Sequence, residues 1–219
     1  MIEKNKIFTL SGLIAPIIFA SFVWLGGSLR TDYSVVSHTI SALNQRGAPN
    51  KTLLDGGFAL SYICMALFGY GLFRNGRRAS DKYRYLIGVL LILSGVICFL
   101  MILMFPADQD YSAPTFAGKM HHVTAVIMVV LAIMMIRFSE LEFKQSKWFK
   151  IYSLGSIIII FAASFATAVS GIMAVRLEGL LERVSIGTFL QWIFVMSLNE
   201  FRGSMFSVKN DYKEKIGPI

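Results

Sequence analysis

The chain has 219 residues, of which 55% are hydrophobic and only 16% are charged, and its formal net charge is +8. A soluble domain carries about a quarter charged residues and does not gather its apolar residues in long blocks. This composition therefore excludes an ordinary soluble domain. The sequence also has no glycine-rich phosphate loop, no CxxC pair and no HExxH motif, which argues against nucleotide-binding and soluble metalloenzyme classes.

Six apolar blocks follow one another along the chain, and each is long enough to predict a membrane-spanning helix, since about 20 residues cross the hydrocarbon core. We expect one all-α domain, a polytopic membrane bundle of six transmembrane helices over residues 1–219. Residues 200–219 are polar and rich in lysine, and we expect them to form a mobile cytoplasmic tail. The six blocks are residues 7–29, 53–73, 85–105, 120–137, 151–175 and 184–198.

The basic residues predict how the bundle is oriented. Fifteen of the 21 Lys and Arg residues flank one side of the predicted helices, and six flank the other. The positive-inside rule places the first group in the cytoplasm, together with both termini of a multi-pass protein of the cell membrane. Because the positive charge flanks apolar blocks, it indicates membrane topology and membrane lipids as partners, and we expect no nucleic-acid partner. The sequence does not indicate an oligomeric state.

The longest predicted connection, residues 30–52, lies on the outer side. If its first part is helical, Ser34 and His38 lie one turn apart on one face, and Ser41 follows on the next turn. Gly47 and Pro49 then end the segment. Long connections without structure of their own are uncommon. We therefore expect a short extracytoplasmic helix or re-entrant loop that covers the bundle.

The two other outer connections also carry polar residues. The sequence DQD follows the third predicted helix, a pair of histidines opens the fourth, and RLEGLLER precedes the sixth. The three connections therefore bring one group of ionisable side chains to one membrane face. This group is His38, Asp108, Asp110, His121, His122, Glu178, Glu182 and Arg183.

A metal-dependent hydrolase or transferase is the first functional hypothesis. Three imidazoles with carboxylates nearby suit a zinc site that has three protein ligands and a water in the open position, and zinc would activate that water against an ester or amide of a lipid-like substrate. Asp108 or Glu182 would be the general base. The candidate metal ligands are His38, His121, His122 and Asp108; the further catalytic candidates are Ser34 and Ser37; the candidate ligand-binding residues are Arg183, Asp110 and Glu178.

Two non-catalytic hypotheses remain beside it. In one, the cluster is a structural polar network, with Asp108 capping a helix or pairing with Lys119, and with Glu182 pairing with Arg30 or Arg46. In the other, the protein is a receptor, transporter or accessory protein that binds a small or lipid-like ligand, and Arg183 is the anion anchor. Neither hypothesis requires a metal or another cofactor.

Four short motifs resemble those of a membrane-protein family known as domain of unknown function 998. They are Ser37-His38-Thr39-Ile40-Ser41 after the first predicted helix, Phe105-Pro106-Ala107-Asp108 after the third, a histidine at the start of the fourth, and Gly179-Leu180-Leu181-Glu182-Arg183 before the sixth. The resemblance covers nearly the whole chain in order and spacing. It implies six helices and a site at the outer face, and it implies no particular activity.

A weaker resemblance is to membrane hydrolases of the alkaline ceramidase and adiponectin-receptor type, which bind zinc between helices. Ser34-x-x-x-His38 and Asp108 fit part of that pattern. The chain departs from it in the last helix, which lacks the family's pair of histidines. His121 and His122 are also adjacent, so their side chains point about 100° apart on a helix.

Overall fold

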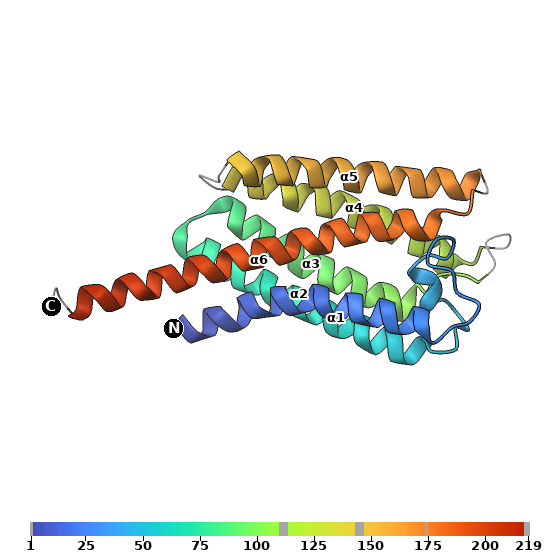
Figure 1. Cartoon of the computed structure of the whole chain (residues 1–219), viewed down its shortest axis with the longest axis horizontal. Coiled ribbons are helices and arrows are strands. Elements are labelled where there is room, and N and C mark those ends of the chain that lie inside the picture. The colour runs from blue at the N-terminus through green and yellow to red at the C-terminus, as the bar shows by residue number, and fades with distance from the viewer. Residues whose placement is uncertain (1, 110–113, 143–146, 174, 217–219) are drawn as a thin grey trace.

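A computed structural model of the protein describes residues 2–109, 114–142, 147–173 and 175–216. These residues form six long α-helices and one short 3-10 helix, with no β-strand in the described part of the chain (Figure 1). The elements are α1 (Ile2–Ser28), η1 (Ser41–Leu43), α2 (Lys51–Ala79), α3 (Lys82–Met104), α4 (Phe116–Glu142), α5 (Lys147–Ile172) and α6 (Glu178–Ile216).

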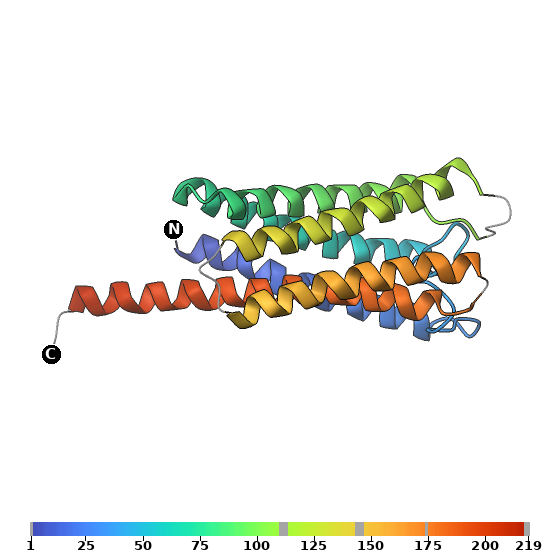
Figure 2. The same cartoon turned by 90° about the horizontal axis from the view of Figure 1, so that it is seen from above.

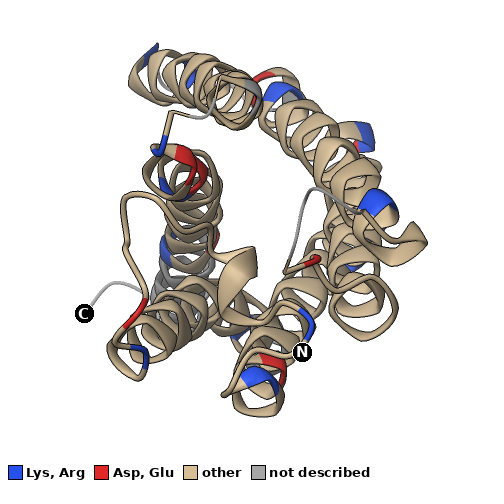
Figure 3. Ribbon diagram, turned by 90° about the vertical axis from the view of Figure 1, so that its right-hand side faces the viewer, with Lys and Arg blue, Asp and Glu red and all other residues tan. Residues whose placement is uncertain are grey.

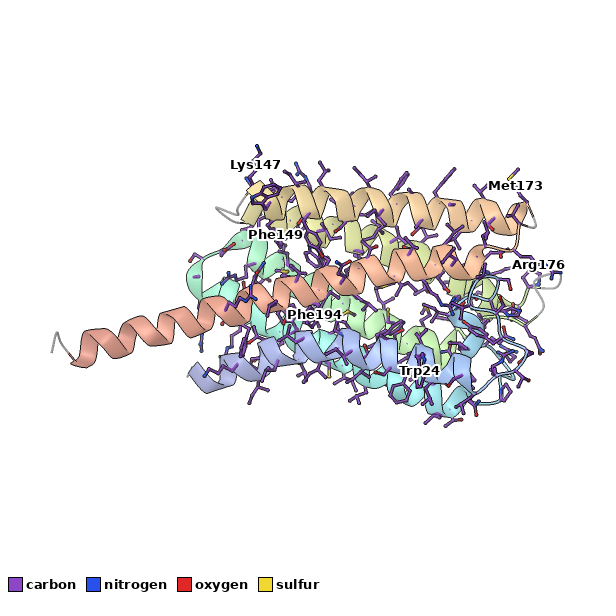
Figure 4. The ribbon with its side chains drawn as sticks, in the orientation of Figure 1. Trp24, Lys147, Phe149, Met173, Arg176 and Phe194 are labelled. Carbon is purple, nitrogen blue, oxygen red and sulfur yellow. The ribbon has the colours of Figure 1, made fainter. Side chains whose placement is uncertain are left out.

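All six long helices contain a segment that can cross a membrane. These segments are 23 to 29 residues long, and their mean hydropathy lies between 1.2 and 3.0. At 1.5 Å per residue, 23 residues extend about 35 Å, which is enough to cross the hydrocarbon core. Large apolar side chains such as Phe161 and Phe165 are 62% and 64% exposed, as lipid-facing residues are. Figure 4 shows such side chains along the outer side of α5, up to Met173 at its end. The protein is therefore a multi-pass membrane protein.

Each helix packs against its neighbours in sequence, and α6 also packs against α1, so the six helices form a closed ring (Figure 3). Both termini lie at one end of the bundle, and α6 projects beyond the other helices there (Figure 2). We call this end the basic end. The opposite end carries the three connections between α1 and α2, α3 and α4, and α5 and α6. We call it the loop end.

Two apolar clusters fill the bundle. The larger takes side chains from all six helices, with Trp192, Met135 and Ile160 fully buried at its centre. The smaller lies nearer the loop end and includes Ile40 and Leu43 from the connection between α1 and α2, packed against α1, α2 and α3. This connection is thus part of the core, and its buried apolar residues fix the positions of the polar groups beside them.

The tightest helix pair is α2 with α3. A Cβ atom on Gly88 would lie 2.2 Å from the backbone nitrogen of Phe73, so only glycine permits this crossing. Ser80 turns the chain with a positive φ of 54°, and the side chain of Asp81 caps α3 by accepting a hydrogen bond from the backbone N–H of Arg84. Local turn chemistry therefore sets this hairpin at the basic end.

The helices extend beyond the apolar blocks that predict them. The membrane-spanning segment of α6 begins at Glu178, six residues before the predicted start, and α6 continues to Ile216 through the stretch that we expected to be a mobile tail. The reason is physical: apolar blocks mark where a helix meets lipid, whereas charged residues such as Glu, Lys and Arg are good helix formers outside it.

Candidate functional site

The connection between α1 and α2 lies across the loop end of the bundle and is built from short turns. The backbone N–H of His38 donates to the carbonyl oxygen of Ser34 at 2.8 Å, and Leu43 donates to Ile40 at 3.0 Å within η1. Ile40 and Leu43 are buried in the smaller apolar cluster. The predicted outer helix is therefore one helical turn followed by a 3-10 helix of three residues. We call residues 30–50 the cap.

Arg183 fastens the cap to α6. One guanidinium nitrogen, Nη1, donates to the carbonyl oxygens of Val35, His38 and Gly179 at 2.8–2.9 Å, and Nη2 donates to the hydroxyl of Tyr33. These donors satisfy carbonyl groups of the cap that regular secondary structure does not pair. Arg183 thus acts on backbone atoms of the cap.

Gly179 permits that contact because it brings the backbones of α6 and the cap together. A Cβ atom there would lie 2.3 Å from the carbonyl oxygen of His38 and 2.8 Å from that of Val35. The neighbouring N–H of Leu180 donates to the carbonyl oxygen of Val36 at 3.0 Å. The start of α6 is therefore hydrogen-bonded to the cap along its backbone.

Glu182 makes the complementary contact. Its Oε2 atom accepts a hydrogen bond from the backbone N–H of Ile40, just before η1 begins. The structural interpretation paired Glu182 with Arg30 or Arg46, and this was wrong. Arg30 instead pairs with Asp32 at 2.6 Å and donates to the carbonyl oxygen of Ala42 at 2.9 Å. Charged side chains therefore hold the cap both from α6, through Glu182, and from within the cap, through Arg30.

Tyr33 lies at the centre of these contacts, although the sequence did not single it out. Guanidinium groups of Arg30 and Arg183 lie 5.7 and 5.4 Å from its ring centroid, and the ring of His38 stacks on it at 5.5 Å. Its hydroxyl donates to the carbonyl oxygen of Thr39 at 2.8 Å. Burial raises the pKa of Tyr33, with the hydrogen bond from Arg183 opposing that rise, so the phenol stays neutral.

His38 itself is exposed, and its Nδ1 accepts a hydrogen bond from the backbone N–H of Ser34 at 2.8 Å. A neutral imidazole that accepts at Nδ1 carries its proton at Nε2. The hydroxyl of Ser34 does not meet this ring; its Oγ faces the backbone N–H of Ser37 at 3.4 Å. Ser34 and His38 therefore form a local turn and not a nucleophile–base pair.

Asp108 caps α4. Its two carboxylate oxygens accept from the backbone N–H and the hydroxyl of Thr115, both at 2.7 Å, and the same hydroxyl accepts from the N–H of Gly118 at 3.1 Å. These bonds lower the pKa of Asp108. A Cβ atom on Gly118 would lie 1.9 Å from the carboxylate. Asp108 is thus a helix cap, as the structural interpretation has it, although with Thr115 and not Lys119 as its partner.

The two adjacent histidines lie in the first turns of α4. His121 contacts the carbonyl oxygen of Phe105 at 2.9 Å through Nδ1, which must be the donor because a carbonyl oxygen only accepts. This bond ties the end of α3 to the start of α4. The ring of His122 lies 5.9 Å from that of His121 at 88°, and its side chain is exposed. The two imidazoles therefore meet edge to face.

A third anchor joins the cap to α2. The side-chain amide of Asn44 donates to Asp55 at 2.9 Å, and Lys51 pairs with the same carboxylate from one turn earlier. These three residues were not predicted as part of the site. Their signal was the i, i+4 spacing of Lys51 and Asp55 directly after the turn that ends the cap.

The structure does not bring the proposed metal ligands together. Among residues 2–109, 114–142, 147–173 and 175–216, no three His, Cys, Asp or Glu side chains are grouped so that they could hold a metal ion. Glu178 is half-buried in the first turn of α6, where an acidic side chain favours the helix dipole. Asp110 lies outside the described residues.

Comparison with known proteins agrees with this architecture. The sequence profile of the family described as "Protein of unknown function (DUF998)" matches residues 13–199. The chain belongs to the DUF998 family. All four motifs that carry the family resemblance lie within the matched range, and each contributes a residue to the contacts of the cap or of the start of α4. No curated protein and no solved structure matches the chain, so the weaker resemblance to zinc-dependent membrane hydrolases gains no support.

Proposed function

We propose that this DUF998 protein is a non-catalytic membrane protein, a ligand-binding or accessory component whose loop end is a rigid cap. The observation that carries the proposal is the use of Glu182 and Arg183. Both side chains end on backbone atoms of the cap, at Ile40 for the carboxylate and at Val35 and His38 for the guanidinium. Charged groups engaged in this way stabilise a fixed surface and are poorly placed to exchange protons with a substrate.

The alternative is a zinc-dependent hydrolase that acts on a lipid-like substrate, and the hydrogen bonds of the imidazoles are the observation that bears on it. His121 has its Nδ1 bonded to a carbonyl oxygen, so its Nε2 lone pair could bind a metal. His38 has the opposite tautomer, with Nδ1 accepting and Nε2 protonated. Binding zinc at Nε2 of His38 would require the ring to give up the bond to Ser34. The chemistry of the donor set therefore fits zinc poorly.

We also propose that the loop end is extracytoplasmic and that the protein resides in the cell membrane. The distribution of Lys and Arg supports this: 15 of 21 flank the basic end. Loops with few basic residues are the ones that are translocated. Both termini would then be cytoplasmic, and the cap would face the outside.

Hydrogen–deuterium exchange of the purified protein tests the cap. Arg183→Met keeps the length of the side chain and removes its donors, so we expect amides 33–43 to exchange at least tenfold faster than in the wild type. Arg176→Met is the matched control, because Arg176 is exposed beside the same end of α6 and makes no bond to the cap. Equal exchange in both variants would contradict the proposal.

Metal content separates the two functions. We expect less than 0.1 equivalent of zinc in protein purified with zinc supplied and without chelator. Near-stoichiometric zinc that is lost in a His121→Ala/His122→Ala variant would instead establish the hydrolase and direct the search to lipid esters and amides.

A further inference from the structure

The outward face of α6 holds a polar side chain at mid-membrane depth. Gln191 is exposed, although it lies in the segment Glu178–Arg202 that crosses the membrane. Gln191 lies thirteen positions after Glu178 and eleven positions before Arg202. At 1.5 Å per position, it is about 20 Å from one end of the segment and about 16 Å from the other. Water does not reach an amide at that depth.

The position of Gln191 on the helix shows that it points away from the bundle. Phe189 and Ile193, two residues before and after it, both pack in the larger apolar cluster. Two residues correspond to about 200° of rotation, so Gln191 lies on the opposite side of α6. Figure 1 shows α6 in front, between α5 and α1, with no other helix covering this side.

The amide of Gln191 makes no hydrogen bond to any residue that the structure describes. An amide without a partner is costly in hydrocarbon, where neither lipid nor water can satisfy it. The other carboxamides within the membrane-crossing segments, Asn75 and Asn199, lie within the last five residues of those segments, where head groups and water are near. Among the carboxamides of the described membrane-crossing segments, Gln191 is thus the one that lies farthest from either end.

The surroundings of Gln191 suit a second helix. Leu180, Val184, Gly187 and Gln191 follow the 4-3-4 spacing of a left-handed helix pair, and all four are exposed. A Cβ atom on Gly187 would meet nothing within 4 Å, so the backbone of α6 is open to close approach there. Small residues beside a polar side chain are typical of helix–helix contacts in membranes.

We propose that this face of α6 binds the same face of a second copy of the chain. An amide carries both donors and an acceptor, so a two-fold axis beside Gln191 lets each copy donate one N–H to the carbonyl oxygen of the other. The two amides are then at the same depth by symmetry. This reciprocal pairing satisfies both groups without a second kind of protein.

Disulfide cross-linking in native membranes tests the contact. In a Cys64→Ser/Cys98→Ser background, Val184→Cys is expected to form a covalent homodimer with copper phenanthroline. Phe165→Cys on α5 is the control at similar depth, since it is 64% exposed on another face and is expected to stay monomeric. Equal cross-linking at both positions would overturn the proposal, as would a Val184→Cys product whose mass shows a different protein.

The role of the amide is tested by Förster transfer between donor- and acceptor-labelled chains, diluted in phosphatidylcholine vesicles. Gln191→Leu keeps the size of the side chain and is expected to raise the dissociation constant about 3- to 20-fold. The monomer is expected to keep its melting temperature, because Gln191 is exposed on the side of α6 that faces away from the bundle. An unchanged dissociation constant in Gln191→Leu, or a wild type that stays monomeric at every dilution, would refute the inference.

Discussion

Gly179→Ala gives the sharpest test of how the cap is held. The added Cβ would lie 2.3 Å from the carbonyl oxygen of His38, a backbone atom that cannot rotate away. Reaching ordinary contact requires α6 and the cap to separate by about 1 Å. Overpacking of this kind costs about 1–3 kcal/mol. The displacement also weakens the bond from Leu180 to Val36 and those of Arg183, each worth about 0.5–1.5 kcal/mol.

Alanine opposes part of that loss, since it favours a helix over glycine by up to about 1 kcal/mol, and by less in the first turn, where Gly179 lies. We therefore expect a net destabilisation of about 1–3 kcal/mol, seen as an apparent melting temperature lower by about 2–10 °C in detergent. Gly155→Ala on α5 is the matched control, because nothing lies within 4 Å of its added Cβ, and it should be neutral or slightly stabilising. If Gly179→Ala has the same melting temperature as Gly155→Ala, the idea that position 179 must be glycine because of the close contact between α6 and the cap is refuted.

Three further predictions follow from the contacts of the loop end. Tyr33→Phe keeps the ring between Arg30 and Arg183 but loses both hydrogen bonds of the hydroxyl, to Thr39 and from Arg183, so it should cost about 1–3 kcal/mol in unfolding free energy. Tyr33→Leu should cost more, and equal losses would contradict a role for the ring. Thr115→Val removes the hydroxyl between Asp108 and Gly118 and should cost about 1 kcal/mol, with Thr115→Ser close to wild type in the same melting assay. Because its folded-state pKa is lowered, Asp108 stabilises the fold above its unfolded pKa of about 3.9, and that contribution is lost as pH falls through the folded pKa. A melting series from pH 7 to 3 should therefore show an acid limb that is weaker in Asp108→Asn, and an unchanged limb would refute the assignment.

The sequence predicts the membrane helices well because their cause is local. Twenty apolar residues must span the bilayer as a helix whatever their neighbours do, so the six apolar blocks and their basic flanks carry the architecture. The ends of the helices are less predictable. The start of α6 at Glu178 depends on Gly179 and Arg183 meeting the cap, and that contact joins residues about 140 positions apart.

The sequence predicts that Arg183 and Glu182 lie at the loop end, but it does not predict which groups they contact. A motif shows that two charges lie at the loop end, and charges near a membrane surface suggest ligands. Their actual partners are backbone groups of the cap, and backbone groups have no sequence signature. The same holds for Asp108, whose partner Thr115 is visible only as a helix cap once the start of α4 is known.

Polar side chains have two different kinds of surroundings in this bundle: those at the loop end have partners within the chain, and Gln191 has none in the described part of the chain. At the loop end, Arg183, Glu182 and Asp108 reach partners within the chain, so their cost in a low-dielectric setting is offset inside one molecule. Gln191 has no such partner among the described residues, and it faces lipid. A polar group that a chain leaves unsatisfied in the hydrocarbon region is best explained by a contact outside that chain. Substitutions at the loop end should therefore change the stability of the monomer, and Gln191→Leu should change its association alone.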